Sequence, residues 1–394
     1  MTASTPSDEV PGDEMIRYER DGTVVVLTMD DPASSANTMT GAYIASMGRA
    51  VDRLEAERDE ITGVVLASAK KTWFAGADLS DLQATTPEMA VDFFSRVERV
   101  KADLRRLERL GRPVVAALHG TALGGGFEIA LACHRRIAVD DDRIRFGLPE
   151  VTFGLLPGGG GITRTVRMLG LTEALTQWLL EGRTRTPRQT VAGGLVDELV
   201  ATPDELIPAA TAWITAHADD PDAAIRRWDR PDYRMPGGAP ASPALATILP
   251  GLPARLRRRL RGADLRAPRA ILAAAVEGAQ VDVDTATRIE SRHLTELVTG
   301  RQSAAMIQAF FFDLQAIRSG ANRPAGIERR AVRRVGVLGA GMMGAGIAYA
   351  CAARGIEVVL KDVDLERAMA GKASAERVSA RRGAAGPTTD AETV

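Results

Sequence analysis

Two glutamates beside glycine-rich turns are the residues best suited to chemistry. Glu128 lies in HGTALGGGFEIALAC (119–133), two residues after a run of three glycines, and Glu150 lies in FGLPEVTFGLLPGGGG (146–161), ahead of a second glycine run. If the two carboxyl groups share a pocket, one can be a general base and the other a general acid toward one water molecule. Spacing alone leaves simpler alternatives open: a first-turn acid on a helix dipole for Glu128, and a solvated loop residue for Glu150.

The first glycine run has a chemical use of its own. It joins an expected strand to an expected helix, and successive glycines let a ligand approach backbone N–H groups at a helix N-terminus. Such amides can stabilise developing negative charge, as in an oxyanion hole.

A third glycine motif stands near the end of the chain. GVLGAGMMGAG contains G-x-G-x-x-G as Gly339, Gly341 and Gly344, and Asp362 ends the next expected strand, EVVLKD. The strand, glycine turn, helix and second strand favour an NAD-binding β-α-β unit, with the acid on the ribose 2′-hydroxyl. The alternative is a packing turn that tolerates glycine.

Composition excludes several classes of function. Fifty Lys and Arg nearly balance 51 Asp and Glu, so no global field attracts nucleic acid or an anionic membrane surface. The four histidines and two cysteines lack the close spacing of zinc ligands, and no apolar run reaches the roughly 18 residues of a membrane span. We therefore expect no metal site and no transmembrane segment. Because Cys133 and Cys351 form no disulfide framework, we also expect a cytoplasmic protein.

The elements that must position these residues alternate between strands and helices, which predicts an α/β fold with covered sheet faces. The expected order is strand 23–29, helix 43–57, strand 62–68, helix 88–110, strand 113–120, helix 127–133 and strand 136–139. The segment 230–254 is rich in Pro and Gly, and 304–317 (AAMIQAFFFDLQAI) predicts an amphipathic helix that ends at Gly320 and Pro324.

Three segments carry a family resemblance. FAGADLSDL (74–82), HGTALGGGFEIALACHRRIA (119–138) and GLPEVTFGLLPGGGGITRTVRMLG (147–170) resemble, in order, the signature segments of the enoyl-CoA hydratase/isomerase (crotonase) superfamily. The resemblance covers residues 15–205 and implies the ClpP-like β-β-α spiral fold of that family.

The resemblance also implies a reaction. The amides of Ala77 and Gly125 would hold the thioester oxygen of an acyl-CoA, Glu128 would be the base toward water, and Glu150 the proton donor to the α-carbon. Having both acids favours syn hydration of a trans-2-enoyl-CoA, without a cofactor. Two alternatives stay open: Δ3-Δ2-enoyl-CoA isomerisation, and a non-catalytic assembly or binding remnant.

Further contacts follow from the same motifs. The resemblance implies substrate-binding positions at Ala75, Asp78, Leu79 and Gly124. Lys70 and Lys71, just upstream, could meet CoA phosphates, or they could be a solvated pair at a strand end.

A wider resemblance places this unit in a longer order. WDRPDYRMPGG, PRAILAAAVEGAQVD, AFFFDLQAI and the later glycine turn resemble the α subunit of the fatty-acid β-oxidation multienzyme complex, a hydratase fused to an NAD-dependent 3-hydroxyacyl-CoA dehydrogenase. That family pairs with a thiolase β subunit, and crotonase relatives often form homo-oligomers. Since no histidine follows His293, we expect a truncated, inactive dehydrogenase half and weak NAD binding.

We therefore expect a crotonase domain with a helical extension and a linker helix, then a partial Rossmann β-α-β unit. The expected boundaries are a disordered lead-in (1–14), crotonase core (15–205), helical extension (206–300), linker helix (301–331), partial NAD-binding unit (332–376) and disordered tail (377–394).

Overall fold

The computed structural model describes residues 14–321, 323, 324, 326, 327 and 330–383. The chain divides into two units, Met1–Ser319 and Gly320–Val394, and each is described here by itself. Most of the expected lead-in lies outside the described residues. Glu14, its last residue, pairs with Arg49 at 2.9 Å.

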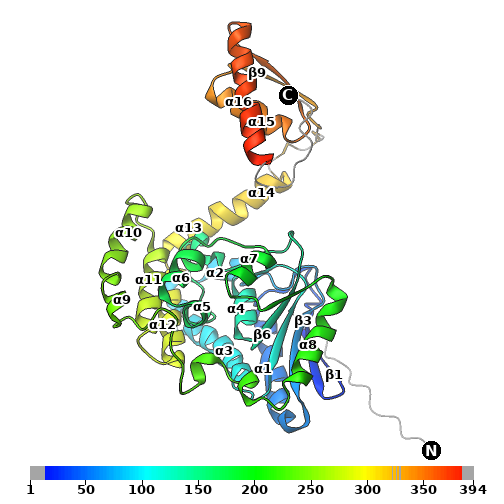
Figure 1. The fold of residues 1–394 in the computed structure, drawn as a ribbon, viewed down its shortest axis with the longest axis vertical. Coiled ribbons are helices and arrows are strands. Elements are labelled where there is room, and N and C mark those ends of the chain that lie inside the picture. The colour runs from blue at the N-terminus through cyan, green and yellow to red at the C-terminus, as the bar shows by residue number, and fades with distance from the viewer. Residues whose placement is uncertain (1–13, 322, 325, 328–329, 384–394) are drawn as a thin grey trace, which may run out of the picture. The chain divides into compact units, whose positions relative to one another are not determined.

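A six-stranded sheet forms the frame of the first unit (Figure 1). Its strands are, in spatial order, β1 (Ile16–Asp21), β2 (Val24–Met29), β3 (Gly63–Ser68), β4 (Val114–Leu118), β6 (Arg135–Val139) and β8 (Glu198–Val200). β1 pairs antiparallel with β2, and all the other pairs are parallel. Every residue of β4 is buried, as expected for a central parallel strand with helices on both faces.

A second, two-stranded sheet joins the three sequence motifs. β5 (Ala122–Leu123) pairs in parallel with β7 (Phe146–Gly147), and Phe74 bridges to Ala122. The amide of Gly124 also donates to the Gly147 carbonyl at 2.9 Å. Three loops that are far apart in the chain therefore lie against one another where these short strands end.

The helices around this junction are buried. All eight residues of α4 (Gly125–Ala132) are buried, and Glu128 is the one charged residue among them. α5 (Gly161–Leu169) is held by Arg164, whose Nε bonds to the Glu108 carboxylate at 2.8 Å with both side chains almost wholly buried. The remaining helices of this region are α1 (Gly41–Ala56), α2 (Leu79–Ala84), α3 (Ala90–Glu108), α6 (Leu171–Glu173), α7 (Pro187–Ala192) and α8 (Leu206–Ala216).

Further helices pack against this core. α12 packs on α3, α5 and α11, and α13 contacts α2. Their bounds are α9 (Pro243–Ala246), α10 (Leu252–Arg259), α11 (Arg266–Gly278), α12 (Val283–Val298) and α13 (Arg301–Ile307).

The expected linker helix is shorter than 301–331. After α13 the chain passes through a π-helical segment, η9 (Gln308–Asp313), into α14 (Leu314–Ser319). The helix α14 ends before Gly320, which takes a left-handed conformation (φ 78°), as glycine often does after a helix.

The second unit is one β-α-β unit followed by a helix. β9 (Arg334–Leu338) pairs in parallel with β10 (Glu357–Lys361), with α15 (Met342–Ala352) between them. α16 (Leu365–Gly383) follows, so residues 377–383, expected in a disordered tail, are helical. Their Ala and Arg residues are good helix formers even without an apolar stripe. The rest of that tail lies outside the described residues.

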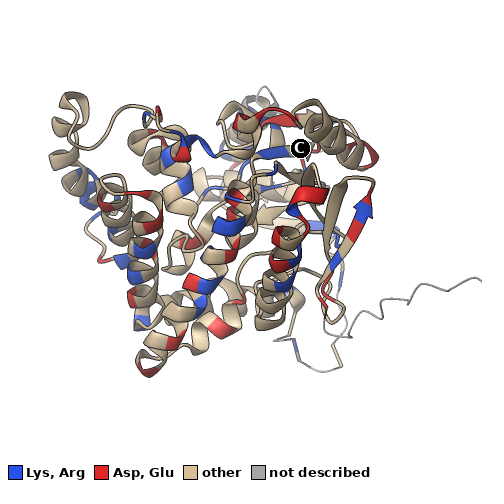
Figure 2. Cartoon of the chain, turned by 90° about the horizontal axis from the view of Figure 1, so that it is seen from below, with Lys and Arg blue, Asp and Glu red and all other residues tan. Residues whose placement is uncertain are grey.

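Charge is spread over the molecule. Figure 2 shows basic and acidic positions interleaved along the helices, which agrees with the near balance of 50 and 51 charged residues. Within the part of the chain that the structure describes, no helix combines the length and the apolar character needed to span a membrane.

Candidate active site

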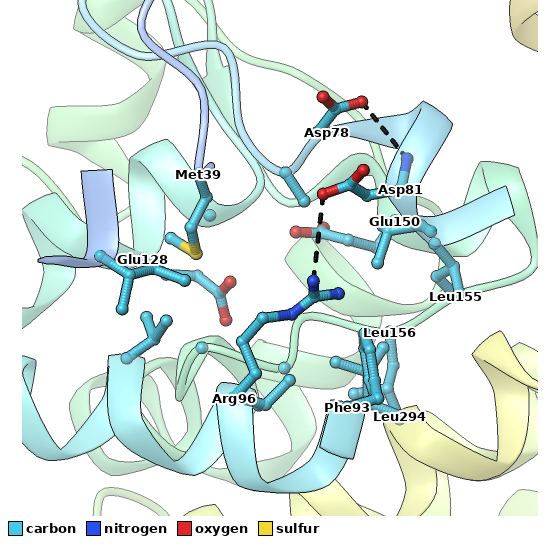
Figure 3. Close-up of a pocket in the computed structure, with 18 residues that line it drawn as sticks. Met39, Asp78, Asp81, Phe93, Arg96, Glu128, Glu150, Leu155, Leu156 and Leu294 are labelled. Carbon is cyan, nitrogen blue, oxygen red and sulfur yellow. Dashed lines mark hydrogen bonds and ion pairs between the residues drawn. The ribbon is translucent and has the colours of Figure 1, made fainter. Parts of the chain in front are cut away.

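A cavity opens where the three motif loops meet, and it holds both candidate acids (Figure 3). Polar groups gather at one part of it, and apolar side chains from several helices form the rest. Its lining residues are Met39, Ile44, Ala77, Asp78, Asp81, Leu82, Phe93, Arg96, Val97, Val100, Gly125, Glu128, Glu150, Leu155, Leu156, Gly158, Gly159 and Leu294.

Two backbone amides face one another in this cavity. The Ala77 nitrogen lies 3.7 Å from the point at which a side chain on Gly125 would begin. Gly125 is the first residue of α4, so its N–H has no acceptor one turn earlier within that helix. Within the described part of the chain, neither amide donates to a backbone carbonyl. Two amides without a backbone acceptor therefore lie close together in the lining of the cavity.

Glu128 reaches from the first glycine run to the second. The Gly161 amide donates to its Oε1 at 2.7 Å, and the residue is only 3% exposed. A Cβ on Gly159 would lie 2.8 Å from Oε2, and one on Gly161 would lie 2.6 Å from Oε1. Because both positions are glycines, the carboxyl group of Glu128 can lie directly against the backbone of the second glycine run.

Glu150 lies against the first glycine run, as Glu128 lies against the second. It stands in the short helix η3 (Pro149–Phe153), and its Oε1 lies 2.7 Å from where a Cβ on Gly124 would be. Its Oε2 is buried and has no hydrogen-bond partner among the described residues. In Figure 3 the carboxyl groups of Glu128 and Glu150 enter the cavity from two sides.

The two acids differ in proton affinity. Burial, followed by the nearby charge of Glu290, raises the pKa of Glu128 to about 7, although the Gly161 amide acts in the opposite direction. Burial and the charge of Glu128 raise the pKa of Glu150 well above its usual value. Because the charge of Glu128 raises the pKa of Glu150, Glu150 keeps its proton while Glu128 is ionised. Both acids therefore hold their protons more tightly than an exposed glutamate does, and ionisation of one makes ionisation of the other less favourable.

Sequence reasoning missed the apolar wall and one charged pair. Phe93, Arg96, Val97 and Val100 occur on α3 at the spacing of one helix face, a pattern that could have marked them. The guanidinium of Arg96 is 3.9 Å from the Asp81 carboxylate, and Figure 3 shows this pair beside Glu150.

The implied substrate contacts are placed unevenly. Asp78 lines the cavity and caps α2 through Ser80 and Asp81, and Leu79 is the first residue of that helix. Ala75 is exposed, and its amide donates to the Asn37 carbonyl.

The two lysines upstream differ in their surroundings. The Lys70 ammonium lies 2.7 Å from Asp30 and thereby lowers the pKa of that acid, whereas Lys71 is exposed.

The glycine turn of the second unit has the form of a nucleotide-binding turn. A Cβ on Gly344 would lie 1.7 Å from the Gly339 carbonyl oxygen, so close packing of helix on strand requires glycine there. Around Gly339 and Gly341 nothing lies within 4 Å of such an atom. Asp362 accepts the Ala340 amide at 2.6 Å, which holds its carboxylate at the turn. These residues fit the adenosine half of a dinucleotide.

Among the described residues, no three His, Cys, Asp or Glu side chains are grouped so that they could hold a metal ion. The cavity can instead move protons with Glu128 and Glu150 while two amides hold an oxyanion.

Two protein family models match this chain. A family model described as "Enoyl-CoA hydratase/isomerase" matches residues 19–230, and one described as "3-hydroxyacyl-CoA dehydrogenase, NAD binding domain" matches residues 334–394.

Curated relatives match most of this chain. The fatty acid oxidation complex subunit alpha of Idiomarina loihiensis is 33% identical over 353 residues, and that of Shewanella baltica is 33% identical over 347. Each alignment covers 87% of this chain and 47% of the relative, so the chain spans about half the length of these relatives.

Among solved structures, an enoyl-CoA hydratase from Bacillus halodurans has a TM-score of 0.51 at 19% identity, covering 75% of this chain and 99% of that one. One from Mycobacterium avium subsp. paratuberculosis has a TM-score of 0.51 at 20% identity, covering 76% and 97%. At this identity the likeness concerns the fold, and it confirms the expected crotonase architecture.

The raised pKa of Glu128 predicts a pH-dependent gain in stability for Glu128→Gln. Between pH 4.5 and about 7 the unfolded chain releases this proton while the folded chain keeps it, so this group lowers the free energy of unfolding as pH rises. At pH 8 the variant should be more stable than the wild type by roughly 1–3 kcal/mol, and the difference should shrink toward pH 5. Urea unfolding at both pH values measures it.

The matched control is Glu173→Gln, at an exposed position on α6. It should leave the free energy of unfolding unchanged at both pH values. A Glu128→Gln variant no more stable than the wild type at pH 8 would contradict the assigned proton affinity.

Proposed function

The chain belongs to the enoyl-CoA hydratase/isomerase family, and from the two acids in its cavity we propose that it hydrates trans-2-enoyl-CoA thioesters. The observation that carries the proposal is the meeting of two carboxyl groups, Glu128 and Glu150, with the amides of Ala77 and Gly125 in one cavity. The names of the relatives place such chemistry in fatty acid oxidation.

In the proposed reaction the thioester oxygen lies between the amides of Ala77 and Gly125. Glu128 takes a proton from water as the water oxygen forms a bond to the β-carbon. The electron pair of the double bond moves toward the thioester, and its negative charge is held by the two N–H groups. Glu150 gives its proton to the α-carbon, which completes the 3-hydroxyacyl-CoA, and no cofactor is needed.

The acyl chain would occupy the apolar part of the same cavity. Leu82 of α2, Phe93 and Val97 of α3, and Leu294 of α12 line it. The polar end and the apolar end together fit a thioester with a hydrocarbon chain.

Other proposals concern the surroundings of the enzyme. The relatives are named as subunits of a complex, which supports a second subunit such as a thiolase, or self-association, for this chain as well. We also place it in the cytoplasm, because Cys133 and Cys351 are free thiols.

The two glutamates should be separately necessary. We expect Glu128→Gln and Glu150→Gln each to lower turnover of crotonyl-CoA by about 10²–10⁴-fold, since each removes one of two cooperating proton-transfer groups. The assay follows loss of the 2-enoyl absorbance, and Glu173→Gln is the control that should keep wild-type turnover.

Product analysis with 2-enoyl and 3-enoyl substrates separates the alternatives. Conversion of 3-enoyl-CoA to 2-enoyl-CoA without hydration would identify an isomerase, and no turnover of either would identify a binding protein. Turnover within about twofold of the wild type in either glutamine variant would overturn the two-acid mechanism.

The oxyanion site predicts a specific effect of Gly125→Ala. The added Cβ would lie 3.7 Å from the Ala77 nitrogen and 3.0 Å from the flexible end of Met39, in the space proposed for the thioester oxygen. We expect kcat/KM to fall about 10²–10³-fold while the unfolding midpoint changes little. Stopped-flow hydration and urea unfolding test this.

Two glycines serve as controls. Gly41→Ala has nothing within 4 Å of its Cβ and should be neutral in both assays. Gly126→Ala would place Cβ 2.5 Å from the Phe74 carbonyl oxygen, so it should lower stability itself. Wild-type hydration by Gly125→Ala would mean that the oxyanion donors lie elsewhere.

We propose that Gly339, Gly341, Gly344 and Asp362 hold the adenosine half of NAD. When bound, NAD is the hydride acceptor in a hydroxyacyl-CoA dehydrogenase. The described residues of the second unit form a single β-α-β unit, which corresponds to one mononucleotide half.

This arrangement predicts weak NAD binding. We expect a Kd of about 1 mM or weaker by calorimetry, reduced further by Asp362→Ala, and no NADH from 3-hydroxybutyryl-CoA. NADH formation in proportion to the concentration of this chain would contradict the prediction.

A further inference from the structure

The N-terminus of α5 is held by carboxyl groups from two other helices. Its N-cap residue is Gly160, which has no side chain to accept the first free amides. Glu128 of α4 accepts the Gly161 amide at 2.7 Å, and Glu290 of α12 accepts the Thr163 amide at 2.5 Å. The Thr163 hydroxyl donates to the same oxygen of Glu290. One helix end therefore joins Glu128 to a second acid that the proposed mechanism does not use.

Glu290 is completely buried, with 0% of its surface exposed. Its Oε2 has no hydrogen-bond partner among the described residues. A buried carboxyl group in this state is costly, and helix packing alone would be served by an apolar residue. Its retention in the core beside Glu128 therefore points to a role in the site.

The charged groups that face Glu290 come from three helices. Lys101 of α3 is buried, binds the Thr287 carbonyl and the Ser291 hydroxyl, and pairs with Glu98 at 2.8 Å. Arg164 lies on α5, and Glu128 on α4. Burial is the largest influence and raises the pKa of Glu290, while Lys101, the Thr163 donors and Arg164 act in the opposite direction without cancelling it.

We propose that Glu290 is a positioning residue for Glu128: it fixes the end of α5 that carries the Gly161 amide, and it places a second ionisable carboxyl group behind the base. The proposal rests on the proposed hydratase function, with Glu128 as its base. Glu290 lies 127 residues from Thr163 in the chain and belongs to the helical extension, so the extension would take part in catalysis.

The proposal has two physical consequences. Through Thr163, Glu290 orients the first turn of α5, so that the Gly161 amide meets one oxygen of Glu128 and the other is left to accept a proton from water. Through space, ionisation of Glu290 raises the pKa of Glu128, which makes Glu128 a stronger base.

The test compares Glu290→Gln, Glu290→Leu and a control, Glu296→Gln. Glutamine keeps an oxygen for the Thr163 amide and removes the charge, whereas leucine removes both. Glu296 is an exposed residue of the same helix, α12, so its substitution makes the same chemical change away from the site.

The first readout does not depend on activity. The infrared band of the protonated Glu128 carboxyl group, assigned by its loss in Glu128→Gln, is titrated with pH in each full-length variant. We expect its midpoint to move to lower pH by about one unit in Glu290→Gln and to stay unchanged in Glu296→Gln. If the wild type hydrates no enoyl-CoA, this titration still tests the link between Glu290 and Glu128.

The second readout is hydration of crotonyl-CoA. Glu290→Leu should lower kcat at least about tenfold with KM within about threefold, because a displaced base affects the chemical step more than substrate binding. Glu290→Gln should restore most of that kcat. An unmoved midpoint in Glu290→Gln, or wild-type kcat in a folded Glu290→Leu variant, would overturn the proposal.

Discussion

The burial of two carboxyl groups in one cavity is the constraint on which the rest of this structure depends. Each acid lies against the glycine run of the other segment: Glu128 against Gly159 and Gly161, and Glu150 against Gly124. Neither has an ion-pair partner of its own within 4 Å among the described residues. An unpaired buried carboxylate is unfavourable, so the protein must supply amide donors and a rigid frame. That unfavourable burial is also the source of the difference in proton affinity that acid–base catalysis needs.

The frame is supplied by a layer of paired charges behind α5. Arg164 bonds Glu108 at 2.8 Å and the Gly159 carbonyl at 2.7 Å, so one side chain fixes both the helix and the loop that receives Glu128. Arg226, 4.0 Å from Glu108, bonds the Leu131 carbonyl near the end of α4. Burying these ions carries a large desolvation penalty, so the pairs are better explained by the order they impose on α4 and α5 than by net stability.

The glycine runs indicated where backbone amides and acids could act together, and the family resemblance indicated which residues these are. The glycine runs, the strand before α4 and the resemblance in three segments indicated Ala77, Gly125, Glu128 and Glu150, and the structure brings all four to one cavity. The sequence did not indicate β1 and β8, because edge strands carry little pattern. It also did not indicate the end of α16, which has no apolar stripe. Glu290 could not be found at all, since its contact with Thr163 spans 127 residues.

Contacts with the helical extension also explain why glycine is so frequent in the loop from 154 to 161. A Cβ on Gly158 would lie 2.2 Å from Leu294 of α12, and one on Gly154 would lie 2.9 Å from Met306 of α13. The loop from 154 to 161 thus accommodates the helical extension at two positions and the carboxyl group of Glu128 at two others. Leu294 also lines the cavity, and Glu290 accepts the Thr163 amide at the start of α5. The single helix α12, outside the motif-bearing core, therefore contributes both to the cavity wall and to the contacts that hold the helix end beside Glu128.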